Sequence, residues 1–183
     1  SVPAYGSEWY SRFMYQEDRP EYAYHREKFG PQNEFGYKEL IPLFRGEKFD
    51  AEEWISLFKR AGARYVVPVA EHHGFMMYDS NLSPFTAVNM GPCRDVLGEL
   101  KEACKHNGLI MGASHHRAEH YWFMEGARLC GDVNDPDFEE YYGPAMPSPE
   151  DCEGYEETPQ LIAHMQDWLV RCCELVDRYR PKL

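Results

Sequence analysis

The apolar residues between Asp50 and Gly62 recur at the spacing of an amphipathic helix. Asp50 and Glu53 stand three residues apart, as in a capping box at a helix start, and glycine is common just after a helix end. The spacing predicts a helix whose inward face consists of Trp54, Ile55, Phe58 and Ala61.

Two further helices are predicted downstream. One covers residues 92–106, stops at Asn107-Gly108 and turns five residues inward: Val96, Leu97, Leu100, Ala103 and Cys104. The other begins with Thr158 as its cap and Pro159 at its first position, and Pro181 ends it. Its predicted apolar stripe consists of Leu161, Met165, Trp168, Leu169, Cys172, Val176 and Tyr179.

Two short apolar runs, residues 64–70 and 109–113, predict strands buried on both faces. They alternate with the helices, and this order is typical of a parallel sheet built from βαβ units. Lys182-Leu183 is predicted to start another strand. Residues 1–45 are predicted to be ordered loop with short helical turns, and residues 114–157 a long functional loop.

Composition narrows the class of protein. The 183 residues suit one α/β domain but are short for an α/β barrel, which needs about 250 residues. A net charge of −12 argues against a nucleic-acid partner, because Lys and Arg must neutralise phosphates. The sequence contains no apolar run near the roughly 18 residues of a membrane span. The six cysteines include no C-x-x-C pair, so a zinc ribbon is not predicted.

Polar residues follow both predicted strands at their carboxyl ends. His72-His73 come after the first strand, and Ser114-His115-His116 come after the second. Ligands of α/β folds bind at this end of a parallel sheet, so the repetition favours a binding site over simple strand capping.

A metal site is the alternative for these residues, with His72, His116 and His120 as ligands, since His116 and His120 are spaced i, i+4. Adjacent histidines on a strand point to opposite faces, which disfavours His72 and His73 as ligands of one ion.

Glu8-Trp9 places a carboxylate beside a large ring. This pair is typical of a sugar subsite, in which the ring packs on a C–H face and the carboxylate accepts hydroxyl hydrogen bonds. A surface loop with one anchoring tryptophan is the alternative interpretation.

Four segments together are similar to glycoside hydrolase family 29, the α-L-fucosidases. They are "SVPAYGSEWY", "KFDAEEWISLFKRAGARYVVPVAEHHGFMMYDS", "RDVLGELKEACKHNGL" and "MGASHHRAEH", in this order. The resemblance implies that residues 1–183 are the N-terminal-central part of one (β/α)8-like catalytic domain, incomplete at both ends, and thus a partial TIM-like barrel. It also implies a retaining enzyme that hydrolyses terminal α-L-fucosyl residues of glycans or glycoconjugates.

By the same resemblance, Glu8, Trp9, His72 and His73 bind fucose, and His115 or His116 takes the role of a tyrosine found after the next strand in many members. One departure concerns the loop after His73. The family usually has H-H-D-G-F or H-H-E-G-F, whereas this chain has "HHGF" and is one acidic residue shorter.

The resemblance places the nucleophile just after Leu183 and the acid/base beyond it, so no catalytic residue is expected within the chain. It implies no metal or other cofactor, and a parent protein that is secreted, periplasmic or lysosomal. Two alternatives stay open: a metal-dependent hydrolase on a similar barrel that uses His72, His116 and His120, and an inactive sugar-binding relative.

Overall fold

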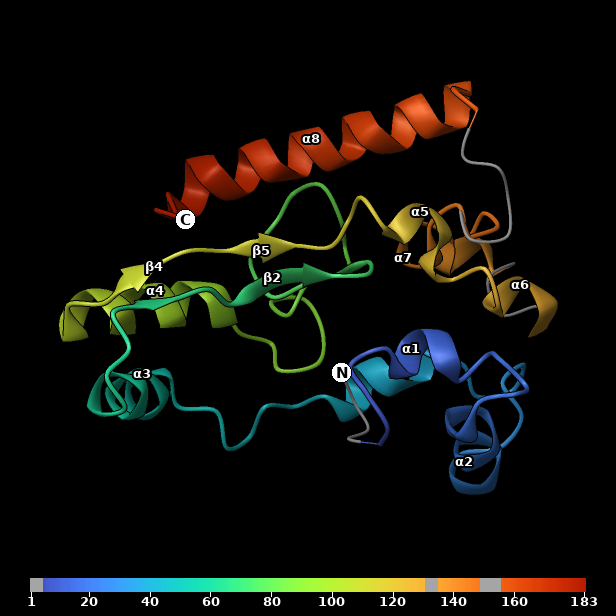
Figure 1. The fold of residues 1–183 in the computed structure, drawn as a ribbon, viewed down its shortest axis with the longest axis horizontal. Helices are drawn as coiled ribbons and strands as arrows, with labels where there is room; N and C mark the ends of the chain where they lie inside the picture. Colours follow the sequence, from blue (N-terminus) through green and yellow to red (C-terminus); the bar gives the residue numbers. More distant parts are fainter. Residues whose placement is uncertain (1–4, 131–134, 149–155) are drawn as a thin grey trace. The chain divides into compact units, whose positions relative to one another are not determined.

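The computed structural model describes residues 5–130, 135–148 and 156–183 of the chain (Figure 1). The chain divides into two compact units, each of which is described here by itself. The first unit consists of Ser1–Phe44 and Ala118–His164, and the second of Arg45–Arg117 and Met165–Leu183. That the chain is part of a single domain stays a prediction.

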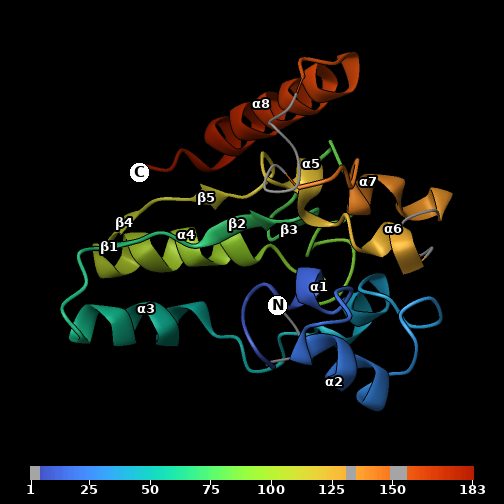
Figure 2. The same ribbon diagram turned by 45° about the vertical axis from the view of Figure 1, so that its right-hand side comes forward.

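The second unit alternates helices with short strands, which confirms the predicted α/β class. Among the described residues it forms one sheet of two strands and one of three, and no closed barrel. Its elements are α3 (Ala51–Arg60), β1 (Tyr65–Val66), β2 (Val69–His72), β3 (Phe75–Met76), α4 (Val96–Asn107), β4 (Ile110–Met111), β5 (Ser114–His115) and most of α8 (Pro159–Tyr179). Figure 2 shows β1 beside β4, and β2 between β3 and β5.

The run predicted as one strand over residues 64–70 forms β1 and β2, and β2 continues to His72. The strand predicted over residues 109–113 contains β4, and β5 begins at Ser114, beyond the predicted end. The parallel ladder between the two runs is nevertheless continuous. The backbone N–H groups of residues 110, 112, 114 and 116 donate to the carbonyls of residues 64, 66, 68 and 71. Pro68 lacks an N–H group and interrupts the strand assignment. Both pairings, β1 with β4 and β2 with β5, are parallel, as predicted.

The ladder contains one extra residue in β2. Val69 is opposite Ser114 and Glu71 is opposite His115, so two steps in β2 match one step in β5. Such a bulge reverses the alternation of side chains. Val69 is 40% exposed, whereas Ala70 and Glu71 are both fully buried. The bulge therefore turns the Glu71 carboxylate into the protein interior.

The strands are not buried on both faces, contrary to prediction. Tyr65, Val67, Val69 and Ile110 are between 40% and 59% exposed, while Ala70 and Met111 lie in the core. The apolar residues of these strands therefore form two apolar faces of the sheet. The described residues cover one of these faces and leave the other exposed.

The predicted third strand is supported by two backbone hydrogen bonds at the end of the chain. The N–H of Lys182 donates to the Met111 carbonyl (2.8 Å), and the N–H of Ala113 donates to the Leu183 carbonyl (3.1 Å). Gly112 permits this approach, because a Cβ there would lie 2.8 Å from the Leu183 Cβ and 3.0 Å from its carbonyl oxygen.

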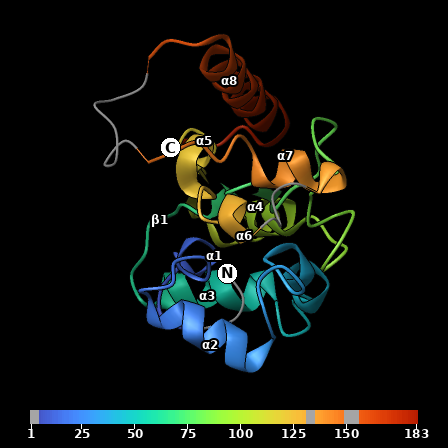
Figure 3. The ribbon, with the colours of Figure 1, turned by 90° about the vertical axis from the view of Figure 1, so that its right-hand side faces the viewer.

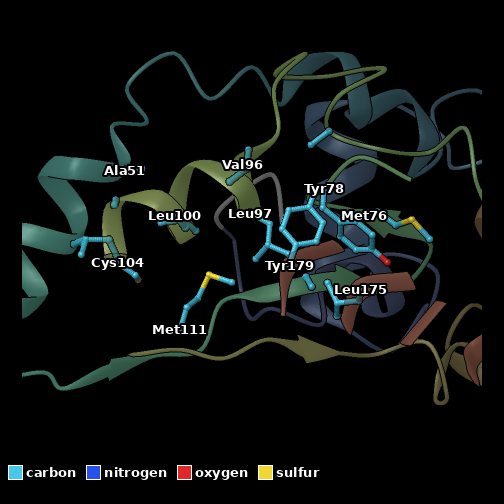
Figure 4. Packing of buried hydrophobic residues seen from close by; sticks show 14 of the residues in the cluster. Ala51, Met76, Tyr78, Val96, Leu97, Leu100, Cys104, Met111, Leu175 and Tyr179 are labelled. Atoms are coloured by element: carbon cyan, nitrogen blue, oxygen red, sulfur yellow. The ribbon is translucent and has the colours of Figure 1, made fainter. Parts of the chain in front are cut away.

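The core of the second unit lies between the strands, α3, α4 and the end of α8. In Figure 4, Leu97 of α4 lies against Tyr78 and Tyr179, with Met111 and Leu175 close by. Ala51 and Ile55 are buried on α3 and Phe58 is partly buried, but Trp54 is 46% exposed and packs edge-on against Phe49. Of the predicted inward face of α3, Ile55 and Phe58 are thus confirmed, whereas Trp54 and Ala61 are exposed.

The buried side of α8 differs from the predicted stripe. Leu169 and Val176 are 59% and 54% exposed, whereas Arg171 is 1% exposed. The side chains that α8 buries are His164, Arg171, Leu175 and Tyr179. The charged side chain of Arg171 thus occupies the middle of the buried face of α8. It can do so because it is paired with the buried carboxylate of Glu71.

The first unit is built from short helices: α1 (Tyr10–Phe13), α2 (Pro20–Lys28), η1 (Lys38–Leu43), α5 (His120–Phe123), α6 (Ala127–Cys130), η3 (Pro136–Phe138) and α7 (Glu139–Tyr142). Figure 3 shows α1 and α2 of this unit, which are in contact. The nine-residue α2 is longer than the turns predicted for residues 1–45. Within the described part of the chain, we find no helix with the length and hydropathy of a bilayer span.

The predicted helix starts are confirmed at α3 and α8. The Asp50 side chain accepts from the Glu53 N–H (2.9 Å), and the Thr158 hydroxyl accepts from the Leu161 N–H (3.1 Å). Helix α4 begins later than predicted, because the Asp95 carboxylate caps it at the Gly98 N–H (2.8 Å) and also accepts from the Tyr179 hydroxyl (2.8 Å).

We expect Asp95→Ala to destabilise the protein more than Asp50→Ala. Loss of an N-cap costs about 1 kcal/mol, and Asp95→Ala also removes the buried hydrogen bond of Tyr179, for a total of about 2–3 kcal/mol. Urea unfolding of both variants measures this difference. A double-mutant cycle with Tyr179→Phe should give a coupling of about 1 kcal/mol for Asp95 and none for Asp50. Equal coupling for the two would contradict the bridge between α4 and α8.

Candidate functional site

His73 and Gly74 form a two-residue turn that joins β2 to β3. His72 is the last residue of β2 and pairs with Phe75 in the antiparallel register. His73 and Gly74 have φ angles of 45° and 89°, and positive φ at both central residues is typical of a type I′ hairpin turn. The short loop of "HHGF" is therefore a tight hairpin.

This turn brings the two adjacent histidines together. Because His73 has left the strand, the alternation that would place the two rings on opposite faces does not apply to it. The ring centroids of His72 and His73 are 4.5 Å apart, with the rings nearly perpendicular. The objection to the two histidines sharing one ligand was therefore wrong.

His116 completes a cluster of three imidazoles. It follows β5, and its ring centroid lies 5.2 Å from that of His72 and 5.8 Å from that of His73. One ring nitrogen of each histidine lies within 4.8 Å of the others. His73 is buried, and His72 and His116 are partly exposed. Neutral imidazoles both donate and accept hydrogen bonds, so the cluster suits a ligand rich in hydroxyl groups or a metal ion.

His115 and His120 each have a partner outside this cluster. The Nε2 atom of His115 lies 3.1 Å from the Glu71 carboxylate, in the interior behind β2. The Nε2 atom of His120 is 2.9 Å from the Tyr141 carbonyl oxygen, and both residues belong to the first unit. The structure thus brings His116, and not His115, to His72 and His73. Because His120 belongs to the first unit, a metal triad of His72, His116 and His120 stays a prediction.

A buried ionic network supports the strands that carry the cluster. The fully buried Glu71 carboxylate lies 3.4 Å from Nη1 of Arg171 and 3.7 Å from Nη1 of Arg117. Both arginines also contact Asp167 of α8 through Nε, at 2.9 Å and 2.8 Å. Two carboxylates and two guanidiniums thus join β2, α8 and the residue after His116.

The network holds Glu71 in its ionised form. Burial alone would raise the pKa of Glu71, but the hydrogen bond from His115 and the positive charges of Arg171 and Arg117 outweigh burial and lower the pKa below its ordinary value. A carboxylate of this kind is a structural anion beneath the histidines and is not available as an acid.

Glu8 and Trp9 belong to the first unit, so their place beside the histidines stays a prediction. Glu8 is exposed, and Trp9 is partly buried. The Trp9 ring packs edge-on against Phe123, with 5.5 Å between centroids, and near Phe13 and Trp122. Arg12 fixes this aromatic group, since it lies over the Trp122 ring and donates to the Phe123 carbonyl (2.9 Å).

Sequence reasoning missed the roles of Glu71, Arg117, Asp167 and Arg171. One signal was available. Arg171 stands between apolar positions in the middle of an amphipathic helix, and Glu71 interrupts the apolar end of a strand. Buried charges of opposite sign are commonly paired, so the sequence could have suggested a buried ion pair between Arg171 and Glu71.

The fold and the site define an α/β protein with polar side chains gathered at the carboxyl ends of parallel strands. The family model described as alpha-L-fucosidase matches residues 1–183. The chain therefore belongs to the α-L-fucosidase family.

Curated relatives agree with this assignment. The chain is 39% identical to tissue alpha-L-fucosidase of Homo sapiens over 126 residues, which are 67% of this chain and 26% of that protein. It is 33% identical to alpha-L-fucosidase of Dictyostelium discoideum over 132 residues, which are 67% of this chain and 28% of that protein. The match thus spans about a quarter of the length of these relatives.

Solved structures show the same backbone. The crystal structure of Thermotoga maritima alpha-fucosidase matches 95% of this chain and 36% of its own, with a TM-score of 0.73 and 28% identity. The structure of that enzyme in complex with fucose matches with a TM-score of 0.70 over the same shares. The described elements therefore have their counterpart in a fucosidase structure.

We expect Glu71→Gln to cost about 3–5 kcal/mol of unfolding free energy at pH 7, because it removes the fully buried anion that both guanidiniums face and leaves them only the partly exposed Asp167. Since folding lowers the pKa of Glu71, its contribution is fully present above the unfolded pKa, about 4.3, and is lost as the pH falls through the folded value. Urea unfolding between pH 3 and pH 7 measures this.

The control is Glu102→Gln, which affects an exposed carboxylate on α4 that pairs with Lys105. Its effect should stay within about 0.5 kcal/mol. A difference between wild-type and Glu71→Gln proteins that does not shrink toward low pH would contradict the ionised assignment of Glu71.

Proposed function

We propose that the protein that carries this chain is a retaining α-L-fucosidase that hydrolyses terminal α-L-fucosyl residues of glycans or glycoconjugates. The observation that carries the proposal is the cluster of His72, His73 and His116 at the ends of β2 and β5, in a chain of the α-L-fucosidase family. In this proposal the described strands and helices are part of a (β/α)8-like barrel, and the exposed face of β1 and β4 turns toward its interior.

The three imidazoles fit the chemistry of a sugar with several free hydroxyl groups. Each hydroxyl both donates and accepts hydrogen bonds, and so does each neutral imidazole. The turn at His73 gives this ring a fixed direction, and the position after β5 places His116 opposite it. A buried side chain such as His73 has little conformational entropy left to lose when the sugar binds.

Fucose also has an apolar face and a methyl group, and we assign these to the aromatic group around Trp9. The ring is partly exposed and is backed by Phe13, Trp122 and Phe123. Glu8, which precedes it and is exposed, would accept hydrogen bonds from sugar hydroxyls.

The catalytic carboxylates are proposed to lie outside these residues. A retaining glycosidase needs two carboxyl groups about 5–5.5 Å apart, one as nucleophile and one as acid/base. Glu71 is the carboxylate next to the histidines in sequence, but it is fully buried and occupied by His115, Arg117 and Arg171. The histidines therefore bind and orient the sugar, and the bond is cleaved by carboxylates from other strands.

His72→Ala and His116→Ala in the full-length protein should lower kcat/KM for an aryl α-L-fucoside by about 2- to 12-fold each. This corresponds to a lost hydrogen bond of about 0.5–1.5 kcal/mol. For His73 we choose Asn, which tolerates positive φ and therefore keeps the turn while it removes the ring. His106→Ala, at an exposed histidine of α4, is the control and should leave kcat/KM unchanged. If kcat/KM is unchanged in all three site variants, the histidines only cap the ends of their strands and do not bind the sugar.

The isolated 183-residue chain should release no detectable aryl alcohol from an aryl α-L-fucoside, whereas the full-length protein should be active. The reason is that acid–base assistance alone contributes about 10²–10⁴-fold, and the nucleophile is proposed to be missing as well. A spectrophotometric assay of both proteins side by side decides this. Turnover by the isolated chain that is abolished by changing one of its own acids would place the catalytic carboxylates within these residues.

A further inference from the structure

The cluster of His72, His73 and His116 also has the composition of a metal site. Each histidine offers one ring nitrogen, and the three nitrogens lie within 4.8 Å of one another. Imidazole nitrogen suits Zn²⁺, Cu²⁺ and Ni²⁺, whereas Mg²⁺ and Ca²⁺ prefer oxygen ligands. Three histidines that leave a fourth position open to water are a known arrangement for Zn²⁺.

The distances allow an ion after small side-chain movements. Zn–N bonds of about 2.0–2.1 Å in a tetrahedral site place the nitrogens roughly 3.4 Å apart. Since the nitrogens lie within 4.8 Å of one another, the longest separation must shorten by at most about 1.4 Å, which tilting of the two partly exposed rings can supply. The buried His73 ring is held by its turn and needs to move least.

The surrounding charges do not oppose a cation. The ionic network behind β2 contains two carboxylates, Glu71 and Asp167, and two guanidiniums, Arg117 and Arg171. These four charges balance. The chain as a whole carries a net charge of −12, which favours cation approach at low ionic strength.

We propose that His72, His73 and His116 bind one divalent transition-metal ion of the Zn²⁺ class, and that this ion and the sugar exclude each other. The ion would occupy the nitrogen lone pairs that otherwise accept hydrogen bonds from the sugar hydroxyls. Metal binding therefore inhibits the enzyme instead of assisting it. The exclusion rests on the proposed function, whereas the metal site itself does not.

The test is a calorimetric titration of the full-length, metal-free protein with Zn²⁺, together with the visible absorption of the Co²⁺-loaded protein. We expect one ion per chain, at least 100-fold weaker binding in His72→Ala, His73→Asn and His116→Ala, and unchanged binding in His106→Ala. Thermal melts in the presence of a chelator establish that the variants fold. Absence of saturable binding would overturn the proposal, as would binding that survives the three changes or a Co²⁺ spectrum with thiolate charge-transfer bands, which would indicate cysteine ligands.

The second arm repeats the Zn²⁺ titration in the presence of L-fucose. The apparent affinity for Zn²⁺ should fall in proportion to the occupancy of the sugar site. If Zn²⁺ binds and fucose binds without affecting it, mutual exclusion is wrong. If fucose does not bind at all while Zn²⁺ does, the proposed sugar site fails and the metal site stands.

Discussion

The buried carboxylate of Glu71 is the constraint on which the second unit depends. A charge with no exposed surface must be neutralised where it lies, and Arg171 and Arg117 approach it from α8 and from the residue after His116. Asp167 in turn holds both guanidiniums. The position of α8 along the strands is therefore set by ion pairing as much as by apolar packing, and this explains why α8 buries an arginine while it exposes Leu169 and Val176.

Two irregularities of the backbone bring three histidines of this sheet together. The bulge between Val69 and Glu71 sends the carboxylate inward and leaves His72 on the other side. The turn at His73 and Gly74 then folds the second histidine back beside the first. A regular strand would have separated the two rings by its pleat. Each irregularity interrupts the regular pairing of the strands by one residue, and together the two bring three imidazoles into one cluster.

Local signals in the sequence predicted the caps at Asp50 and Thr158, the order of helices and strands, and the parallel pairing. These features depend on residues a few positions apart. The ion pair between Glu71 and Arg171 joins residues that are 100 positions apart, so neither its geometry nor the buried face of α8 follows from periodicity. The closeness of the His72 and His73 rings depends on a positive φ at His73. Strand alternation predicted the opposite, because it was applied one residue too far, whereas the family resemblance predicted that both histidines serve one site.

The turn after His72 determines how a change in loop length would affect the histidine cluster. Where many members of the family have an acidic residue between the histidine pair and the glycine, this chain has none, and its loop has the two-residue length of a hairpin turn. An inserted residue would change the turn type, rotate the second imidazole and bring a carboxylate to the pocket rim in one event. We therefore expect an insertion or deletion at this turn to alter the arrangement of the three imidazoles more than a substitution beside it does.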